Sequence, residues 1–167
     1  MKLTPSNQLE LLIHGNVLKY LIFLYQEDKL PNKILLKGQK GIGKSTLAYH
    51  LINFVLSKNE DFTYDIDHFK IDEMNRSFKL INNGSSPNFF LIDIQADKKN
   101  INIDQIRNII QDLNKSSLNN KPKFILIDNS EYLNKNSINV LLKEIEEPNN
   151  NIYFILIQNQ KTLLSTL

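Results

Sequence analysis

Apolar residues follow two patterns along this chain: short unbroken runs and longer stretches with helical spacing. The runs predict four short buried strands, at residues 33–37, 89–94, 124–127 and 152–157. Between the runs, apolar residues recur every three or four positions, which is typical of helices with one buried face. The chain therefore alternates between predicted strands and predicted helices.

Three helices are predicted before the second strand. They cover residues 8–26, residues 46–57 and, as a short element, residues 73–80. In the second of them the apolar positions 47, 51, 54 and 55 fall on one side, which is expected to face the core.

Two more helices follow the second and third strands. Asp104 is expected to cap the first of them. Either Asn134 or Asn136 is expected to cap the other, which Pro148 stops. The residues expected to face inward are Ile106, Ile109, Ile110 and Leu113 on the first, and Ile138, Leu141, Leu142 and Ile145 on the second.

Strands that alternate with helices predict an α/β fold, in which a mostly parallel central sheet carries helices on both faces. The 167 residues are enough for one domain with a core of its own. Residues 58–87 are polar and are expected to form a variable insert in this domain. His68 lies in the insert beside acidic residues, and a single histidine without a spaced partner predicts a solvated surface residue, not a metal site.

Composition excludes several classes of protein. The chain has no cysteine, which excludes disulfides and cysteine-ligated zinc. No apolar run approaches the ~18 residues that a membrane-spanning helix needs, and residues 1–10 lack the apolar core of a signal peptide. A cytoplasmic protein without a membrane partner is therefore expected. The net charge of +2 argues neither for nor against nucleic acid.

The strongest local signal is the run from Gly38 to Thr46, which fits the pattern G-x-x-x-x-G-K-[ST]. It stands between a predicted strand and a predicted helix, the context that a phosphate-binding loop requires. Backbone N–H groups of such a loop point at phosphate oxygens, and the following helix adds its positive end. The alternative is a glycine-rich surface turn. The candidate nucleotide-binding residues are Gly38, Gln39, Lys40, Gly41, Ile42, Gly43, Lys44, Ser45 and Thr46.

Within this loop, Lys44 is expected to reach the β- and γ-phosphates of ATP, and the Ser45 hydroxyl to hold Mg²⁺. Asp128 follows a strongly apolar predicted strand, and an acid at that position can be the second residue for Mg²⁺. Lys44 and Asp128 are thus the candidate catalytic residues. The alternative for Asp128 is that it only starts a turn.

The residue after Asp128 leaves hydrolysis open. ATPases of this layout usually carry a glutamate there, whereas this chain carries Asn129. An amide can orient a water molecule but cannot accept its proton. Glu131 lies two positions further on and is a doubtful substitute. ATP binding is therefore favoured, and turnover is not.

The segments at residues 127–134 and 139–148 resemble bacterial sliding-clamp loaders of the AAA+ class. The family pattern is an Asp-rich box, then Asn-Ala-Leu-Leu-Lys, one or two residues, and Leu-Glu-Glu-Pro; this chain has Val140 and Ile145 where the pattern has Ala and Leu. Residues 101–107 and 157–167 are similar to neighbouring family blocks, and Gly15 with the helix after it is similar to an element that flanks the nucleotide.

This resemblance implies a three-layer P-loop NTPase domain over residues 1–167. The missing glutamate after Asp128 is more similar to delta-prime than to gamma/tau subunits of DNA polymerase III. Gln158 is then a tentative sensor of the γ-phosphate, with plain solvation as the alternative. The four-cysteine zinc module common in the family is absent or replaced by residues 58–86. A trans-acting arginine, a helical lid and a collar domain that follow in the family lie outside these 167 residues, which predicts an amino-terminal fragment or a natural truncation.

The function implied by the resemblance is ATP-dependent assembly with gamma/tau and delta subunits, which opens a sliding clamp and loads it on primer-template DNA. One alternative is a non-catalytic scaffold subunit. Another is an unrelated P-loop NTPase, such as a helicase loader or a small kinase, although the chain has only the two arginines Arg76 and Arg107. Lysines that could touch DNA phosphates, with a solvated face as the alternative, are Lys98, Lys99, Lys115, Lys121 and Lys123.

Overall fold

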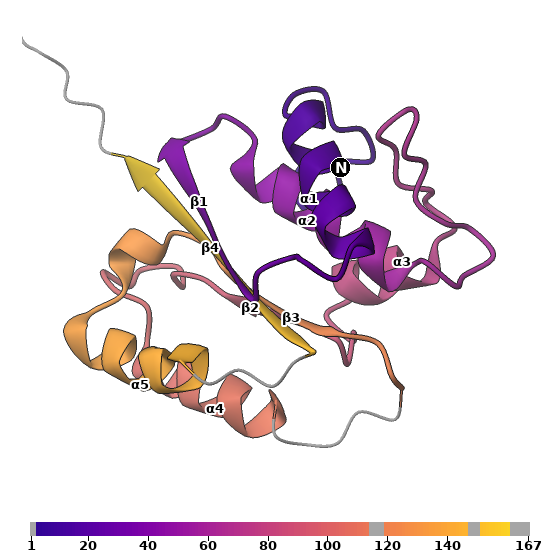
Figure 1. The fold of residues 1–167 in the computed structure, drawn as a ribbon. Helices are drawn as coiled ribbons and strands as arrows, with labels where there is room; N and C mark the ends of the chain where they lie inside the picture. The colour runs from indigo at the N-terminus through magenta and orange to yellow at the C-terminus, as the bar shows by residue number, and fades with distance from the viewer. Residues whose placement is uncertain (1–2, 114–118, 147–150, 161–167) are drawn as a thin grey trace, which may run out of the picture.

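A four-stranded parallel sheet forms the centre of the molecule (Figure 1). The computed structural model describes residues 3–113, 119–146 and 151–160. In these residues the strands are β1 (Lys33–Gln39), β2 (Phe89–Ile92), β3 (Lys123–Ile127) and β4 (Ile152–Gln160), in the spatial order β1-β4-β3-β2. Because all three pairings are parallel, the carboxyl ends of the strands meet at one edge of the sheet.

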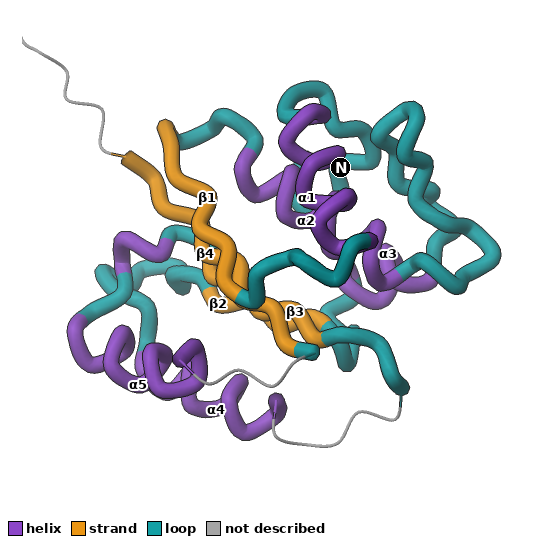
Figure 2. The backbone as a smooth tube through the Cα atoms, viewed as in Figure 1, coloured by secondary structure: helices purple, strands orange, loops and turns teal. Residues whose placement is uncertain are grey.

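Helices cover both faces of this sheet (Figures 1 and 2). The first face carries α1 (Gly15–Gln26), α2 (Lys44–Leu56) and α3 (Arg76–Asn82), and the second carries α4 (Ile103–Leu113) and α5 (Lys135–Glu146). A short 3₁₀ helix, η1 (Ser130–Tyr132), follows β3.

The core lies in two apolar clusters, one on each side of the sheet, and β3 contributes to both. Phe124 and Leu126 belong to the cluster under α1 and α2, whereas Ile125 and Ile127 belong to the cluster under α4 and α5. Alternate residues of a strand point to opposite faces, so a strand covered on both sides is apolar throughout. The predicted three-layer α/β fold is confirmed.

The prediction of a helix from residue 8 is wrong over residues 8–14. The Leu11 N–H donates to the Phe69 carbonyl at 3.0 Å, and the Ile71 N–H donates to the Leu9 carbonyl at 2.8 Å. These backbone groups are therefore used in pairing with the insert. His14 has a left-handed backbone, with φ of 69°, directly before α1 begins.

Asparagine residues cap both α4 and α5, and only the cap of α5 is among the predicted residues. Asn102 Oδ1 accepts the Asp104 N–H at 3.0 Å, so Asn102 caps α4 and the expectation for Asp104 is wrong. Asn134 Oδ1 accepts the Ser137 N–H at 2.8 Å, which decides between the two candidate caps of α5 in favour of Asn134. In both cases the asparagine directly before the helix satisfies an N–H of its first turn.

The inward face of α5 lies at different positions from those predicted. Leu141 is buried, but Ile138 and Leu142 are 39% and 42% exposed, so their expected inward position is wrong. Ser137 is fully buried and Val140 packs against the core, which places the contact stripe one position away from the predicted one. On α4, Ile106 and Leu113 are buried as expected, and Ile109 and Ile110 are partly buried.

Several expectations fall on residues outside the described ranges. They concern Lys115, Pro148, the side chain of Ile145 and residues 161–167 of the family block at 157–167. The described part of the chain contains no helix long and apolar enough to cross a membrane.

The polar insert is fixed to the rest of the domain. Glu60 accepts hydrogen bonds from Ser77 Oγ at 2.6 Å and from Lys121 Nζ at 2.8 Å, and Tyr64 Oη lies 2.8 Å from the ring of the buried His50.

Lys123 is buried, and its ammonium donates to the Leu113 carbonyl. Lys121 and Lys123 thus have roles inside the domain, which opposes a contact with DNA for these two lysines.

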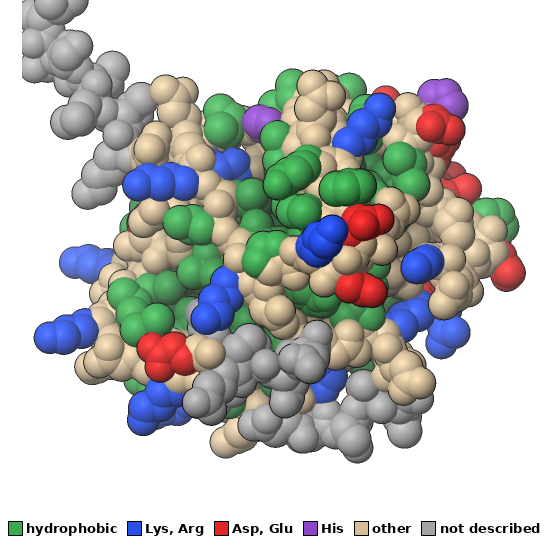
Figure 3. Space-filling view, viewed as in Figure 1, with side chains coloured by type: hydrophobic (Ala, Val, Ile, Leu, Met, Phe, Trp, Pro, Cys, Tyr) green, Lys and Arg blue, Asp and Glu red, His purple; other side chains and the backbone are tan. Residues whose placement is uncertain are grey.

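Apolar side chains gather on the outer side of α1 and the segment before it (Figure 3). They are Leu3, Leu12, Ile13, Val17, Tyr20 and Phe23, with exposures from 42% to 77%.

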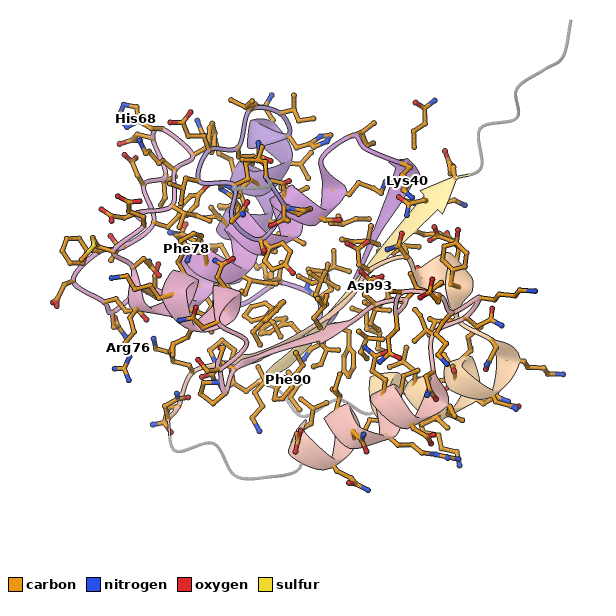
Figure 4. The ribbon with its side chains drawn as sticks, turned by 180° about the vertical axis from the view of Figure 1, so that it is seen from behind. Lys40, His68, Arg76, Phe78, Phe90 and Asp93 are labelled. Atoms are coloured by element: carbon orange, nitrogen blue, oxygen red, sulfur yellow. The ribbon has the colours of Figure 1, made fainter. Side chains whose placement is uncertain are left out.

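His68 lies at the far end of the molecule from the loop residue Lys40 (Figure 4), and its exposed side chain contacts Asp65.

Candidate functional site

The loop between β1 and α2 has the backbone that its glycines predict. Gly41 and Gly43 have φ of +86° and +85°, a left-handed conformation that disfavours any side chain with a Cβ. A Cβ on Gly43 would also lie 3.1 Å from Ile13 Cδ1. The first turn of α2 has no side-chain cap, so its N–H groups are free of the usual side-chain acceptor. Such a loop and helix start fit an anion.

Lys44 begins α2 and is only 6% exposed. Its ammonium donates to the carbonyls of Gly38 at 3.1 Å and Gln39 at 2.5 Å, and to Asn159 Oδ1 at 2.9 Å. Burial lowers the pKa of Lys44, while the carboxylates of Asp128 and Glu131 act in the opposite direction. The charge therefore lies at the carboxyl ends of β1 and β4, where a bound phosphate chain would need it.

Ser45 and Asp128 are brought together from positions far apart in the sequence. Ser45 Oγ donates to Asp128 Oδ2 at 2.7 Å. Burial raises the pKa of Asp128, the hydrogen bonds from Ser45 and the Asn129 N–H oppose the shift, and the neighbouring charges of Asp93 and Glu131 add to it. A hydroxyl beside a carboxylate is an oxygen donor pair that fits Mg²⁺, and a divalent cation would offset the charge of this half-buried acid.

Asn129 does not point at Asp128 but toward the neighbouring strand. Its backbone is left-handed, with φ of 53°, and its Nδ2 donates to Asp93 Oδ1 at 2.8 Å. Asp93 directly follows β2, one residue beyond its end, while Phe90 lies earlier on that strand (Figure 4). Sequence reasoning missed Asp93, although an acid at the end of a predicted strand was a usable signal.

β4 is three residues longer than predicted, and this changes which side chain enters the site. The pairing with β1 continues to Gln39 opposite Gln160, so both Gln158 and Asn159 lie within the strand. Neighbouring residues of a strand face opposite sides. Asn159 lines the cavity of the site, and Gln158 is not among the lining residues. Sequence reasoning missed Asn159.

Glu131 lies on η1 and contacts Asn159 twice. Its carboxylate accepts the Asn159 backbone N–H at 3.0 Å and Asn159 Nδ2 at 2.9 Å. Partial desolvation acts to raise the pKa of Glu131, but the hydrogen bonds from Asn159 and the charge of Lys44 outweigh it and hold the pKa below its usual value.

The site is a cavity of about 270 Å³ at the carboxyl edge of the sheet. Its lining residues are Pro5, Lys40, Gly41, Gly43, Lys44, Ser45, Thr46, Asp128, Asn129 and Asn159. Most of the candidate loop residues therefore lie together with Asp128, whereas Gly38, Gln39 and Ile42 support the loop from outside the lining. Among the described residues, no group of three or more His, Cys, Asp or Glu side chains could hold a metal by itself.

Known proteins are similar to this chain over most of its length. The family model described as DNA polymerase III, delta subunit, matches residues 13–167. The delta-prime subunit of DNA polymerase III from Bacillus subtilis is 30% identical over 158 residues, which cover 93% of this chain and 45% of that protein. The delta-prime subunit from Pseudomonas aeruginosa is 28% identical over 130 residues, covering 78% and 38%. The gamma/tau subunit from Mycoplasma genitalium is 29% identical over 156 residues, covering 92% and 24%.

Solved structures are also similar to this chain. PCH-2 from C. elegans is similar with a TM-score of 0.51 and 18% identity over 95% of this chain and 41% of that one. A gamma-subunit-related protein of DNA polymerase III from Thermotoga maritima has a TM-score of 0.47 and 19% identity over 83% and 39%. The chain thus spans less than half the length of these curated relatives and structures. Because the family model matches most of the chain, the protein belongs to the family described as DNA polymerase III, delta subunit.

Proposed function

We propose that this domain binds Mg-ATP on the loop from Gly38 to Thr46 as part of a sliding-clamp loader. The observation that carries the proposal is the convergence of Lys44, Ser45 and Asp128 on one cavity, with Ser45 Oγ 2.7 Å from Asp128 Oδ2. A buried cation, a glycine loop and an oxygen donor pair are the parts that a triphosphate and its metal require.

Each residue has a defined part in this proposal. Lys44 and the loop N–H groups hold the β- and γ-phosphates, and Ser45 and Asp128 hold Mg²⁺, which supplies neutralisation of phosphate charge when bound. Asn159, not Gln158, takes the position next to the γ-phosphate, because it lines the cavity and contacts Lys44.

Binding without turnover is the form of the proposal that the geometry favours. The Asn129 amide cannot accept a proton from water, and its Nδ2 is committed to Asp93. The same observation supports the second candidate, a scaffold subunit in which nucleotide is structural or absent. The intact loop and the metal-binding pair oppose a pure scaffold.

The wider role in the proposal comes from the names of the relatives. They are delta-prime and gamma/tau subunits of DNA polymerase III, so partner subunits of that complex are expected. The sliding clamp and primer-template DNA enter the proposal from the resemblance of residues 127–134 and 139–148 to clamp loaders. ATP would promote the assembly that opens the clamp. A cytoplasmic location belongs to the same proposal.

Equilibrium binding of Mg-ATP tests the site directly. Lys44→Ala and Asp128→Asn should each weaken binding at least about tenfold. Lys44→Ala removes the ammonium that holds the phosphates, and Asp128→Asn removes a carboxylate ligand of Mg²⁺. Lys37→Ala, at an exposed position on β1, is the matched control and should bind like the wild type. A folded wild type that binds no better than Lys44→Ala would contradict ATP binding and favour the scaffold.

A further inference from the structure

The ammonium of Lys44 has no hydrogen-bond donor left for a phosphate in this structure. A lysine ammonium carries three N–H donors. The three acceptors recorded for it are the Gly38 carbonyl, the Gln39 carbonyl and Asn159 Oδ1. A phosphate oxygen must therefore displace at least one of them before it can bind Lys44 fully.

Of these three acceptors, Asn159 Oδ1 belongs to a side chain that other side chains hold in place. Its amide nitrogen donates to Asn129 Oδ1 at 2.9 Å and to Glu131 Oε1 at 2.9 Å, while its oxygen faces Lys44. The charges on the two sides fix this orientation, because a carboxylate needs a donor and an ammonium needs an acceptor. Both N–H bonds of the amide are thus used, and only its oxygen is turned toward the loop lysine.

Glu131 also fixes the backbone of the same residue. Its second oxygen accepts the Asn159 N–H at 3.0 Å, so one carboxylate clamps both the main chain and the side chain at the end of β4. β4 and η1 contact each other along this region. Glu131 therefore holds Asn159 at two points, and Asn159 in turn holds Lys44.

We propose that Glu131 is a positioning residue that, acting through Asn159, keeps Lys44 on acceptors of the protein and so lowers the affinity of the loop for phosphate. This proposal rests on the proposed nucleotide site and adds its regulation. Glu131 lowers the affinity for phosphate in two ways. It orients the Asn159 amide oxygen that competes for Lys44, and its negative charge lies within electrostatic reach of Lys44. Anything that draws Glu131 away from Asn159 releases the lysine for the nucleotide.

The test uses Mg-ADP as the probe, because its binding needs neither a γ-phosphate contact nor hydrolysis. Glu131→Ala should bind Mg-ADP about three to ten times more tightly than the wild type, since one charge-assisted contact no longer competes. Glu131→Gln keeps one acceptor and loses the charge, so it should fall between the two. Glu27→Ala, which removes an exposed glutamate at the end of α1, is the control and should leave affinity unchanged.

A double-mutant cycle shows whether Glu131 acts through Asn159. Asn159→Ala should itself tighten Mg-ADP binding, and adding Glu131→Ala to it should give less than twofold further gain. If the gain from Glu131→Ala is as large without the Asn159 side chain, the effect is charge alone and the positioning role is wrong. Circular dichroism confirms that each variant is folded.

The outcomes separate this inference from the proposed function. Binding that depends on Lys44 but is unchanged or weakened in Glu131→Ala contradicts the positioning role and leaves the nucleotide site intact. No binding by wild type, Glu131→Ala or Asn159→Ala contradicts both proposals. Binding by Glu131→Ala alone would support the positioning role in its strongest form.

Discussion

Single residues decide the backbone of the loop between β1 and α2, and its two left-handed glycines provide a direct comparison. Gly41 and Gly43 have nearly the same φ, +86° and +85°, but among the described residues only Gly43 has a close neighbour: a Cβ there would lie 3.1 Å from Ile13 Cδ1. Each change to alanine should destabilise the fold by about 1–2 kcal/mol through backbone strain. Gly43→Ala should lose about 1 kcal/mol more because of crowding.

Urea unfolding of both variants measures this difference. Equal losses for Gly41→Ala and Gly43→Ala would show that Ile13 yields without strain, and that the segment before α1 does not restrict the loop. Because the two glycines share their backbone conformation, each serves as the control for the other.

His50 gives the domain a dependence on pH. The side chain is fully buried, between Tyr64 Oη and the Gln8 carbonyl, and burial lowers the pKa of His50 from 6.5 to about 4, against the opposing hydrogen bond to Gln8. Between these two pH values the unfolded chain binds the proton and the folded chain does not. The contribution of His50 to the free energy of unfolding is therefore complete above pH 6.5 and is lost as the pH falls toward 4.

From pH 7 to pH 5 this histidine alone should cost the domain about 2 kcal/mol of unfolding free energy. His50→Gln keeps a donor and an acceptor without a titrating group, so its loss over the same range should be smaller by about that amount. Urea unfolding of both proteins at the two pH values gives the answer. The same loss in both would mean that other groups cause the acid sensitivity.

At the scale of elements, the insert, which contains α3, depends on one largely buried carboxylate. Glu60 accepts the Ser77 N–H and hydroxyl and the Lys121 ammonium, and only 10% of its side chain is exposed. Desolvation acts to raise the pKa of Glu60, but these donors hold it below the usual value, so its contribution is present above the unfolded pKa and is lost on acidification.

Glu60→Ala should destabilise the domain by about 2–3 kcal/mol, because it removes the acceptor of the Ser77 N–H and hydroxyl and the carboxylate partner of Lys121, which keeps its bond to the Leu56 carbonyl. Asp104→Ala is the control. It removes an exposed pair with Arg107, whose side chains are 68% and 57% exposed, and should change stability by less than about 0.5 kcal/mol. Chemical denaturation compares the two. A loss for Glu60→Ala as small as the control's would show that the insert is not anchored there.

At the scale of the whole molecule, a ligand that binds only the folded chain must stabilise it. Mg-ADP at about one hundred times its dissociation constant should add about 2.7 kcal/mol, or roughly 5–10 °C in the unfolding midpoint of a domain of this size. Lys44→Ala should show almost no shift, and chelation of Mg²⁺ should reduce the shift of the wild type. Differential scanning calorimetry measures all three. An equal shift in Lys44→Ala would place the nucleotide elsewhere.

The sequence by itself determined the fold class, the four strands and the glycine-rich loop between β1 and α2, because these depend on local periodicity and on residues within one short run. It also placed Asp128 at a strand end. The tertiary structure alone decided that β4 extends to Gln160, since that length follows from pairing with β1 more than a hundred residues earlier. That pairing brings Asn159 to Lys44, and the parallel order of β2 and β3 brings Asp93 to Asn129. Which side chains meet at the edge of a sheet is set by register and strand order, and both are long-range properties that local pattern does not contain.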